Sequence, residues 1–334
     1  MTWGGKEVNP HGSMFLQTTK PCAALGRFEP RSHRRRPARS KTGHGSAARS
    51  AMTEAAAQFQ KGLDQLATLP QDPKRQRQEL EFCTALGAVM ITVKGYAAPE
   101  TGQTYARAQD LWEQLGFPSE FLRIPYGQAV IQAARGEVDL ALRSDEDLLR
   151  LSRSRNDFDG LVLGLLSFGR DLLFAGRFAL SRSPLEEVLA LYDPISHPSL
   201  VRQAGIHPHV NAQAALGVVL FCLGFLDQAL ARSNASIAEA RRMAHPPSLA
   251  STLAWSTRLL SLGEDHAALG ERVDELVRVT TEQGFPHWGA PGAVCRGWVK
   301  VKNGDVAEGI SLMRSGSSAY HVSAQDRNVT RRAK

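Results

Sequence analysis

Paired histidines near the middle of the chain come closest to the spacing of a metal site. His207 and His209 flank Pro208 in the segment GIHPHVN, and His197 lies upstream of them. Imidazoles bind zinc when three or more ligands converge on one point. The proline and the loop position do not favour that geometry. We therefore expect a solvated loop or a helix N-terminus here, with metal binding as the alternative.

Four cysteines, Cys22, Cys83, Cys222 and Cys295, lie far apart, and no two of them form a CxxC pair. This spacing argues against a zinc site and a disulfide framework and fits a reducing cytosol, so we expect a cytoplasmic protein. All but Cys22 lie in apolar helical runs, where a buried and unreactive thiol is the usual outcome. The sequence contains no HExxH or GxSxG motif, and it predicts a protein without enzymatic activity and without a cofactor.

The elements that must position these side chains are helical from about residue 53 onward. Segments such as GQTYARAQDLWEQLG and LDQALARSNASIAEARRMA place apolar residues at i, i+3/i+4 and i+7. The helical runs break at clusters of Gly, Pro, Asn and Asp, among them KGYAAPETG, RNDFDG and EQGFP. No convincing strand or hairpin pattern is present, so the sequence predicts an all-α fold.

Five turn glycines with spacings of 40, 48, 39 and 41 residues mark an internal repeat. A small residue stands seven positions before each glycine and another stands five positions after it. A glycine can end the first helix with a positive φ, and the small residues can meet where two antiparallel helices cross closely. The repeat therefore predicts helical hairpins stacked into an α-solenoid with a period of about 40 residues. The positions are Ala129, Gly136, Ala141; Gly169, Gly176, Ser181; Gly217, Gly224, Ala229; Ser256, Gly263, Ala268; and Gly297, Gly304, Gly309.

The second unit departs from this pattern, because Pro184 follows its turn in the segment LSRSPLEEVLALYDP. A proline there is expected either to begin or to kink the second helix. The longer interval before the next unit contains the additional loop YDPISHPSLVRQAGIHPH.

Positive charge is concentrated in the first 51 residues. They carry ten Lys/Arg and two acidic residues, whereas the rest of the chain has 30 basic and 31 acidic residues. We expect a disordered basic leader, either a spurious extension before Met52 or an arm that attracts nucleic acid through residues 27–49; a transit peptide is a third reading. No apolar run approaches the roughly 20 residues that span a bilayer, so no membrane association is expected.

Two further segments have both a structural and a functional interpretation. Trp255 and Trp288 lie near the starts of first helices; packing between hairpins is the expected role, and ligand contact in a concave groove is the alternative. The segment SDEDLLRLSRSR, from Ser144 to Arg155, places acidic residues early and basic residues late. That order complements the helix dipole, and a solvated helix face explains it.

Helical hairpins that carry a small residue, a turn glycine and a second small residue such as alanine resemble tetratricopeptide (TPR) repeats. The usual repeat of 34 residues is lengthened here to about 40. The resemblance implies a right-handed solenoid. The amino-acid sequences of several segments resemble one bacterial family more closely. Among these segments are LGFLDQALARSNASIAEARRMAHPPSLA and TEQGFPHWGAPGAVCRGWVKVKNGDVAEGISLMRSGSSAY. This is the C-terminal TPR-like region of adenylate/guanylate cyclase–ATPase (STAND-type AAA) regulators. The resemblance covers roughly residues 60–322 and implies a role in signal transduction.

The sequence also departs from that family. A P-loop needs GxxxxGK[ST], but Gly5-Lys6 is followed by Glu7, and no strand-rich segment could form a cyclase domain. We therefore expect a repeat module detached from its catalytic neighbours, or a truncated one. A cyclase-related protein without its own catalytic domain is an alternative.

The sequence thus predicts a leader at 1–51, a repeat domain at 52–322 and a disordered tail at 323–334. The expected function is a scaffold or sensor that binds a protein or peptide, including an ATPase/cyclase protein, on its concave surface. The first helices of the hairpins are expected to line that surface. Candidate contact residues are Gln128, Gln132, Arg170, Gln213, Trp255 and Arg258.

Overall fold

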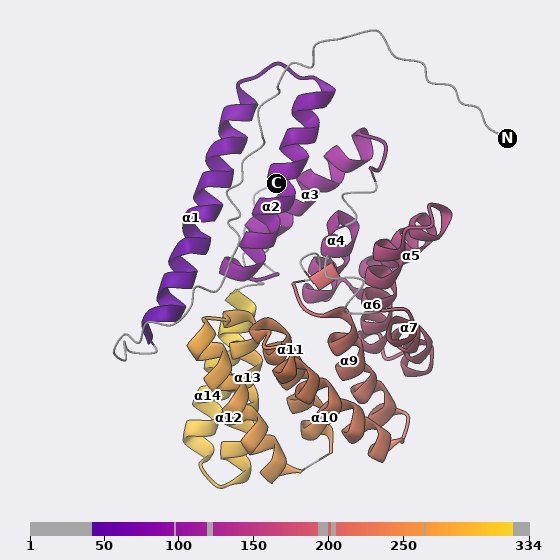
Figure 1. Cartoon of the computed structure of the whole chain (residues 1–334). Coiled ribbons are helices and arrows are strands. Elements are labelled where there is room, and N and C mark those ends of the chain that lie inside the picture. Colours follow the sequence, from indigo (N-terminus) through magenta and orange to yellow (C-terminus); the bar gives the residue numbers. More distant parts are fainter. Residues whose placement is uncertain are drawn as a thin grey trace, which may run out of the picture. The chain divides into compact units, whose positions relative to one another are not determined.

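The computed structural model describes residues 42–96, 98–118, 123–192, 200–201, 205–263 and 265–322. Within these ranges the chain is helical and contains no β-strand. The predicted fold class, an all-α solenoid of TPR-like hairpins, is confirmed (Figure 1). The helices are α1 (Thr42–Ala67), α2 (Pro73–Lys94), α3 (Pro99–Gln114), α4 (Arg123–Ala134), α5 (Val138–Ser154), α6 (Phe158–Phe174), α7 (Phe178–Leu191), α9 (Pro208–Cys222), α10 (Leu226–Arg242), α11 (Pro246–Leu262), α12 (His266–Gln283), α13 (Pro286–Lys302) and α14 (Val306–Val322).

Capping side chains explain where several of these helices begin. The carboxylates of Asp72, Asp157 and Asp265 each accept a hydrogen bond from a backbone N–H in the first turn of α2, α6 and α12. Such caps satisfy N–H groups that have no partner within the helix. Prolines occupy the first turns of α2, α3, α9, α11 and α13, where the missing N–H costs nothing.

The turns between paired helices follow the glycine pattern with one exception. Four of the five repeat glycines have a positive φ, which side chains adopt only with strain: Gly136, Gly176, Gly224 and Gly304. Gly263 differs from the prediction, since its φ is −85°. At Gly263 the backbone keeps the right-handed conformation, and its N–H still bonds to the carbonyl of Leu259, so this helix ends without a left-handed residue.

Small residues lie where the paired helices cross. The Ser181 hydroxyl of α7 donates a 2.6 Å hydrogen bond to the Gly169 carbonyl of α6. A Cβ atom added at Gly217 would lie 3.1 Å from the Ala229 carbonyl oxygen. A Cβ added at Gly297 would lie only 2.5 Å from the Gly309 carbonyl oxygen, so α13 and α14 approach too closely for any side chain there.

The hairpins stack so that their first helices form one inner layer. Each helix packs on its successor, and α4, α6, α9, α11 and α13 also pack on one another in that order. One apolar cluster runs from Leu80 of α2 to Val273 of α12. In addition, α1 packs against α12, so the beginning and the end of the helical array are in contact.

Pro184 lies inside α7, six positions after its first residue, Phe178, and does not begin the helix. A proline within a helix removes one hydrogen bond and crowds the carbonyl four residues earlier, which is that of Leu180. Pro184 is buried between α7 and its neighbours, so packing stabilises the helix against this local cost.

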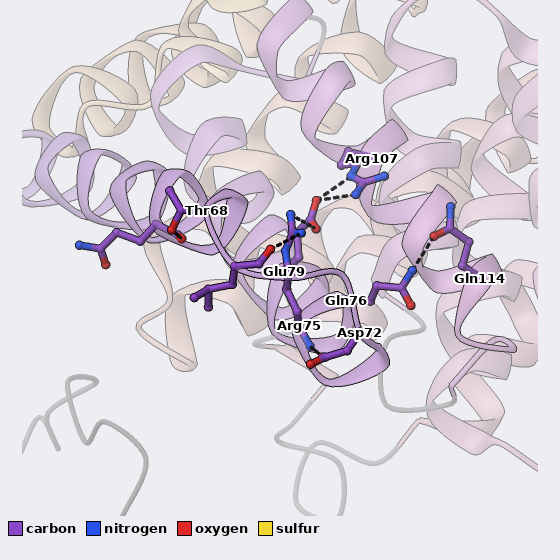
Figure 2. A network of polar contacts seen from close by, with 9 residues as sticks. Thr68, Asp72, Arg75, Gln76, Glu79, Arg107 and Gln114 are labelled. Atoms are coloured by element: carbon purple, nitrogen blue, oxygen red, sulfur yellow. Dashed lines mark hydrogen bonds and ion pairs between the residues drawn. The ribbon is translucent and has the colours of Figure 1, made fainter.

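A polar network joins the first three helices at one side (Figure 2). Glu79 of α2 forms ion pairs with Arg107 of α3 at 2.7 Å and with Arg75 at 3.9 Å. Arg75 also donates a hydrogen bond to the Leu69 carbonyl, and Gln76 donates one to Gln114. The network ties the loop after α1 and the α2–α3 pair together.

The helix α1 begins at Thr42, so the last part of the predicted 1–51 leader is helical. Consecutive alanines in this segment favour a helix. The remainder of the leader, with most of residues 27–49, and the tail at 323–334 lie outside the described residues, as do His197 and most of the 192–204 loop.

Candidate functional site

A cavity of about 450 Å³ lies among the first helices of the hairpins. Its walls come from α4, α6, α9, α11 and α13, with Tyr96 after α2 and Val138 at the start of α5. Cavities of this size, mainly apolar with a few polar groups, are typical ligand-binding sites. The inner layer of helices therefore encloses the strongest candidate site in the described part of the chain.

An aromatic and cationic group forms one wall of this cavity. The rings of Phe174 (α6) and Trp255 (α11) stack with centroids 5.8 Å apart. The Arg258 guanidinium lies over both rings, 4.7 Å from the centroid of Trp255 and 5.5 Å from that of Phe174. Phe174 is 46% exposed although it is large and apolar, so this wall offers ring surface to a ligand.

The opposite ends of the array meet at the same cavity. Tyr96, which follows α2, packs edge-on against His287 of α13 with centroids 4.9 Å apart, and His287 contacts Trp288. Burial lowers the pKa of His287 to about 4, so its imidazole is neutral at physiological pH. Burial also raises the pKa of Tyr96. These two residues therefore contribute no charge to the cavity.

Arg170 of α6 stands in the cavity wall beside two buried carboxyl groups. Asp171 follows it in sequence and Asp145 comes from α5; both are fully buried. Burial opposes a charge on Arg170, but Tyr126, Asp171, Tyr96 and Asp145 outweigh it and raise the pKa of the guanidinium. Residues of α4, α5 and α6 and Tyr96 after α2 therefore favour the charged form of Arg170.

Burial raises the pKa values of both carboxyl groups. Burial and the nearby charge of Asp171 raise the pKa of Asp145 far above its usual range, while hydrogen bonding to Asp171 adds to this effect. Burial also raises the pKa of Asp171, although the Arg170 charge and the hydrogen bond with Asp145 oppose the rise. Both carboxyl groups are therefore harder to ionise than exposed carboxyl groups.

Asn211 of α9 places an amide in the cavity wall. Its Nδ2 donates a 2.8 Å hydrogen bond to the Ser251 hydroxyl of α11. Its Oδ1 is buried and has no hydrogen-bond partner among the described residues. A buried acceptor without a donor is costly, and a ligand N–H reaching this atom would remove the cost.

Three of the six predicted concave residues, Arg170, Trp255 and Arg258, line the cavity. The other three, Gln128, Gln132 and Gln213, are not among its lining residues. The Gln132 side-chain oxygen accepts a hydrogen bond from Ser144 of α5, so it joins α4 to its own hairpin partner. The position of these residues on first helices was not enough to predict which of them face the cavity and which face the second helix of the same hairpin.

Asp145 and Asp171 were missed by the sequence reasoning. The segment from Ser144 to Arg155 was expected to form a solvated face, but only part of it does, such as the exposed ion pair of Asp147 and Arg150. Asp145 lies on the buried face of α5. Asp145 stands three residues after Leu142, four after Ala141 and three before Leu148. This spacing places Asp145 on the apolar face of the helix and could have predicted its burial.

The two tryptophans pack between hairpins, as expected, and also line the cavity. Trp255 is 8% exposed and belongs to the main apolar cluster, yet it also lines the cavity. Trp288 packs against both apolar clusters and lines the cavity as well.

The histidines of the GIHPHVN segment face separate partners. His207 packs edge-on against His245 with centroids 5.1 Å apart, while His209 lies 3.3 Å from a carboxylate oxygen of Glu239. Among the residues that the structure describes, no group of three or more His, Cys, Asp or Glu side chains converges as metal ligands would. Burial lowers the pKa values of His207 and His245.

The three described cysteines are free thiols. Cys83 is buried, and burial raises its pKa to about 11; Cys222 and Cys295 are partly buried, and burial raises their pKa values too. A raised pKa keeps a thiol protonated and weakly reactive. No helix among the described residues is long and apolar enough to cross a membrane.

Comparison with known protein families and with curated proteins finds no match. Among solved structures, the chain is similar to the Rap protein crystallised in complex with Competence and Sporulation Factor. The TM-score is 0.59 at 12% sequence identity, and the match covers 83% of this chain and 78% of the Rap chain. At this identity the likeness shows a common TPR-like fold. The predicted cyclase–ATPase relationship receives no family match.

Proposed function

We propose that this chain is a non-catalytic helical-repeat sensor that binds a peptide in the cavity enclosed by α4, α6, α9, α11 and α13. The observation that carries the proposal is the cavity itself, since all five first helices supply its walls. Its lining residues include a donor, Arg170 Nε, and an acceptor, Asn211 Oδ1, neither of which has a hydrogen-bond partner among the described residues. A peptide supplies both carbonyl and N–H groups and can satisfy both.

The solved structure with a similar fold is a protein bound to a named factor. This likeness supports a role in regulation through binding. The resemblance of the sequence to TPR-like regions of cyclase–ATPase regulators supports a more specific proposal, in which binding is relayed to an ATPase or cyclase partner in signal transduction. A flanking reading frame that encodes an ATPase or a cyclase would support the proposed relay to such a partner. It would not test peptide binding in the cavity.

The proposal is tested by selecting peptides from a randomised library on the full chain and measuring their affinity for two variants. Ala254 of α11 lines the cavity, and Ala254→Trp fills part of it. Ala267 of α12 is exposed, so Ala267→Trp adds the same side chain away from the cavity. We expect Ala254→Trp to abolish binding and Ala267→Trp to preserve it, with thermal unfolding showing that both variants fold.

The opposite pattern would contradict the proposal. If selected peptides bind Ala254→Trp as tightly as the parent chain, the cavity is not their binding site. If cyclic nucleotide formation from ATP or GTP is measured on the purified chain, the non-catalytic role is wrong.

A further inference from the structure

Two histidines connect the beginnings of α9 and α11. His207 and His245 are the N-cap residues of these helices, and their rings pack edge-on with centroids 5.1 Å apart. The Ser248 hydroxyl of α11 accepts a 2.9 Å hydrogen bond from the His207 backbone N–H and lies 2.8 Å from the His245 Nδ1. These three residues form a contact between two helices of the inner layer, which we call the histidine joint.

The cap of α11 requires a neutral His245. Pro246 and Pro247 have no N–H, so the first N–H of the helix belongs to Ser248, and it donates to the His245 Nδ1 at 3.3 Å. Both ring nitrogens of an imidazolium are donors, so a proton on Nδ1 removes the acceptor that this N–H needs. An imidazolium would also stand at the positive end of the helix dipole. Protonation of His245 therefore opposes the cap.

Protonation of His207 is opposed as well. Its Nδ1 is buried and has no hydrogen-bond partner among the described residues, so a proton there gains no acceptor. Burial lowers the pKa of His207, and the neighbouring His245 lowers it further. Burial also lowers the pKa of His245. Both rings therefore take up a proton less readily than they would in an open, solvated joint.

The charged groups around the joint do not reverse this. Glu239 of α10 raises the pKa of His207, but its effect is smaller than those of burial and His245, and His209 lowers the pKa too. Glu239 also lies 3.3 Å from the His209 Nδ1 and 3.6 Å from Arg242, so it already has other cationic neighbours. For His245, burial is the cause of the lowered pKa.

The histidine joint lies one helical turn from the cavity wall. Ile206, directly before His207, lines the cavity, and so do Asn211 and Ser251, which stand one turn further along α9 and α11. The 2.8 Å hydrogen bond from Asn211 to Ser251 is the next polar contact between the two helices. A change in the joint therefore acts on the part of the wall that α9 and α11 form.

We propose that the histidine joint is a pH-sensitive switch, in which protons on His207 and His245 release the cap of α11 and loosen the α9–α11 wall of the cavity. This inference goes beyond the proposed function and does not depend on what the cavity binds. The open joint binds protons more readily than the closed joint. Its stability is therefore complete above the usual histidine pKa of 6.5 and is lost as the pH falls from there through the lower pKa values of the folded state.

Amide hydrogen exchange of the full chain at pH 7.5 and pH 5.5 tests the proposal. Mass spectrometry follows residues 207–222 and 246–262, and the known effect of pH on the chemical exchange rate is divided out. We expect the protection of both segments to be about three- to tenfold lower at pH 5.5. One pH unit below 6.5, a single histidine with a lowered pKa can shift the opening equilibrium by up to about tenfold.

Two variants assign the effect to the joint. His245→Asn keeps a side chain that can cap α11 but does not titrate, and His207→Phe keeps an aromatic ring that does not titrate. Each should reduce the loss of protection, and the double variant should remove it. His266→Asn is the matched control, because His266 begins α12, beyond the other end of α11. It should keep the full loss.

The ring titrations provide a second measurement, which does not depend on how well the variants pack. NMR of the ¹³C-histidine-labelled full chain gives the midpoint of each ring, and the signals missing from the two single variants identify His207 and His245. We expect both midpoints below 6.5. Midpoints at or above 6.5 would overturn the inference, as would equal protection at the two pH values or a loss that the double variant keeps in full. If Ala254→Trp still excludes library peptides in these cases, the proposed peptide site stands without the switch.

Discussion

Two clusters of arginine and carboxylate groups in this protein have opposite compositions. In the network of Figure 2, one carboxylate, Glu79, forms ion pairs with two arginines, Arg75 and Arg107, and the pair with Arg107 links α2 to α3. At the cavity wall, one arginine, Arg170, lies in the field of two buried carboxyl groups, Asp145 and Asp171. The first cluster therefore has more cations than acids, and the second has more acids than cations.

The two clusters differ in how far water reaches them. Arg107 is 41% exposed and Glu79 is 13% exposed, so water reaches the outer part of the first cluster. Asp145 and Asp171 are fully buried. Burying these two carboxyl groups is costly, and such groups often lie at functional sites.

The largest effect is expected from removing the cation of the buried cluster. Arg170→Leu leaves two buried carboxyl groups without a positive charge and should lower the free energy of unfolding by about 3 kcal/mol at neutral pH. Urea denaturation measures this loss. Arg107→Leu is the control, since Glu79 keeps Arg75, and its loss should be smaller. Equal losses would show that the two clusters do not differ as described.

A smaller effect is expected from the titration of Asp171. The folded state raises the pKa of Asp171 from 3.8 to about 6, so the folded protein keeps a proton that the unfolded chain releases. Stability is therefore fully present below the unfolded pKa and falls as the pH rises from about 4 through about 6, by on the order of 1–3 kcal/mol.

Asp171→Asn removes the group that titrates in this range and should flatten the dependence. Chemical denaturation of both proteins across the same pH range measures the two slopes. An Asp171→Asn variant with an unchanged slope would show that another group causes the loss of stability.

The smallest effect is expected in the network between α2 and α3. Glu79→Gln removes both ion pairs but leaves the helices in contact, so it should cost no more than about 1 kcal/mol, and less at high salt. Thermal unfolding at low and high ionic strength tests this. If Glu79→Gln lowers stability more than Arg170→Leu does, and the loss does not depend on salt, the comparison between the two clusters is wrong.

The hairpins could be predicted from sequence because their determinants are local. A turn glycine such as Gly224 and small residues such as Gly217 and Ala229 stand at fixed distances within each hairpin. Even the exception at Gly263 changes one turn conformation without altering the pairing of α11 with α12.

The site was harder to predict because its residues come from helices far apart in the chain. Arg170, Trp255 and Arg258 were found from their positions on first helices. Tyr96 contacts His287, and α1 packs on α12, although these elements lie far apart in the chain. The spacing of the repeats does not indicate either contact. The burial of Asp145 was not predicted, because acidic residues are rarely fully buried.

The central claim is that the inner layer of first helices binds a peptide. It is tested most directly by photo-cross-linking a selected peptide that carries a benzophenone and locating the adduct by mass spectrometry. The structure predicts adducts on α6, α11 and α13, around Phe174, Trp255 and Trp288. Adducts confined to the second helices α5, α7, α10 and α12 would contradict it.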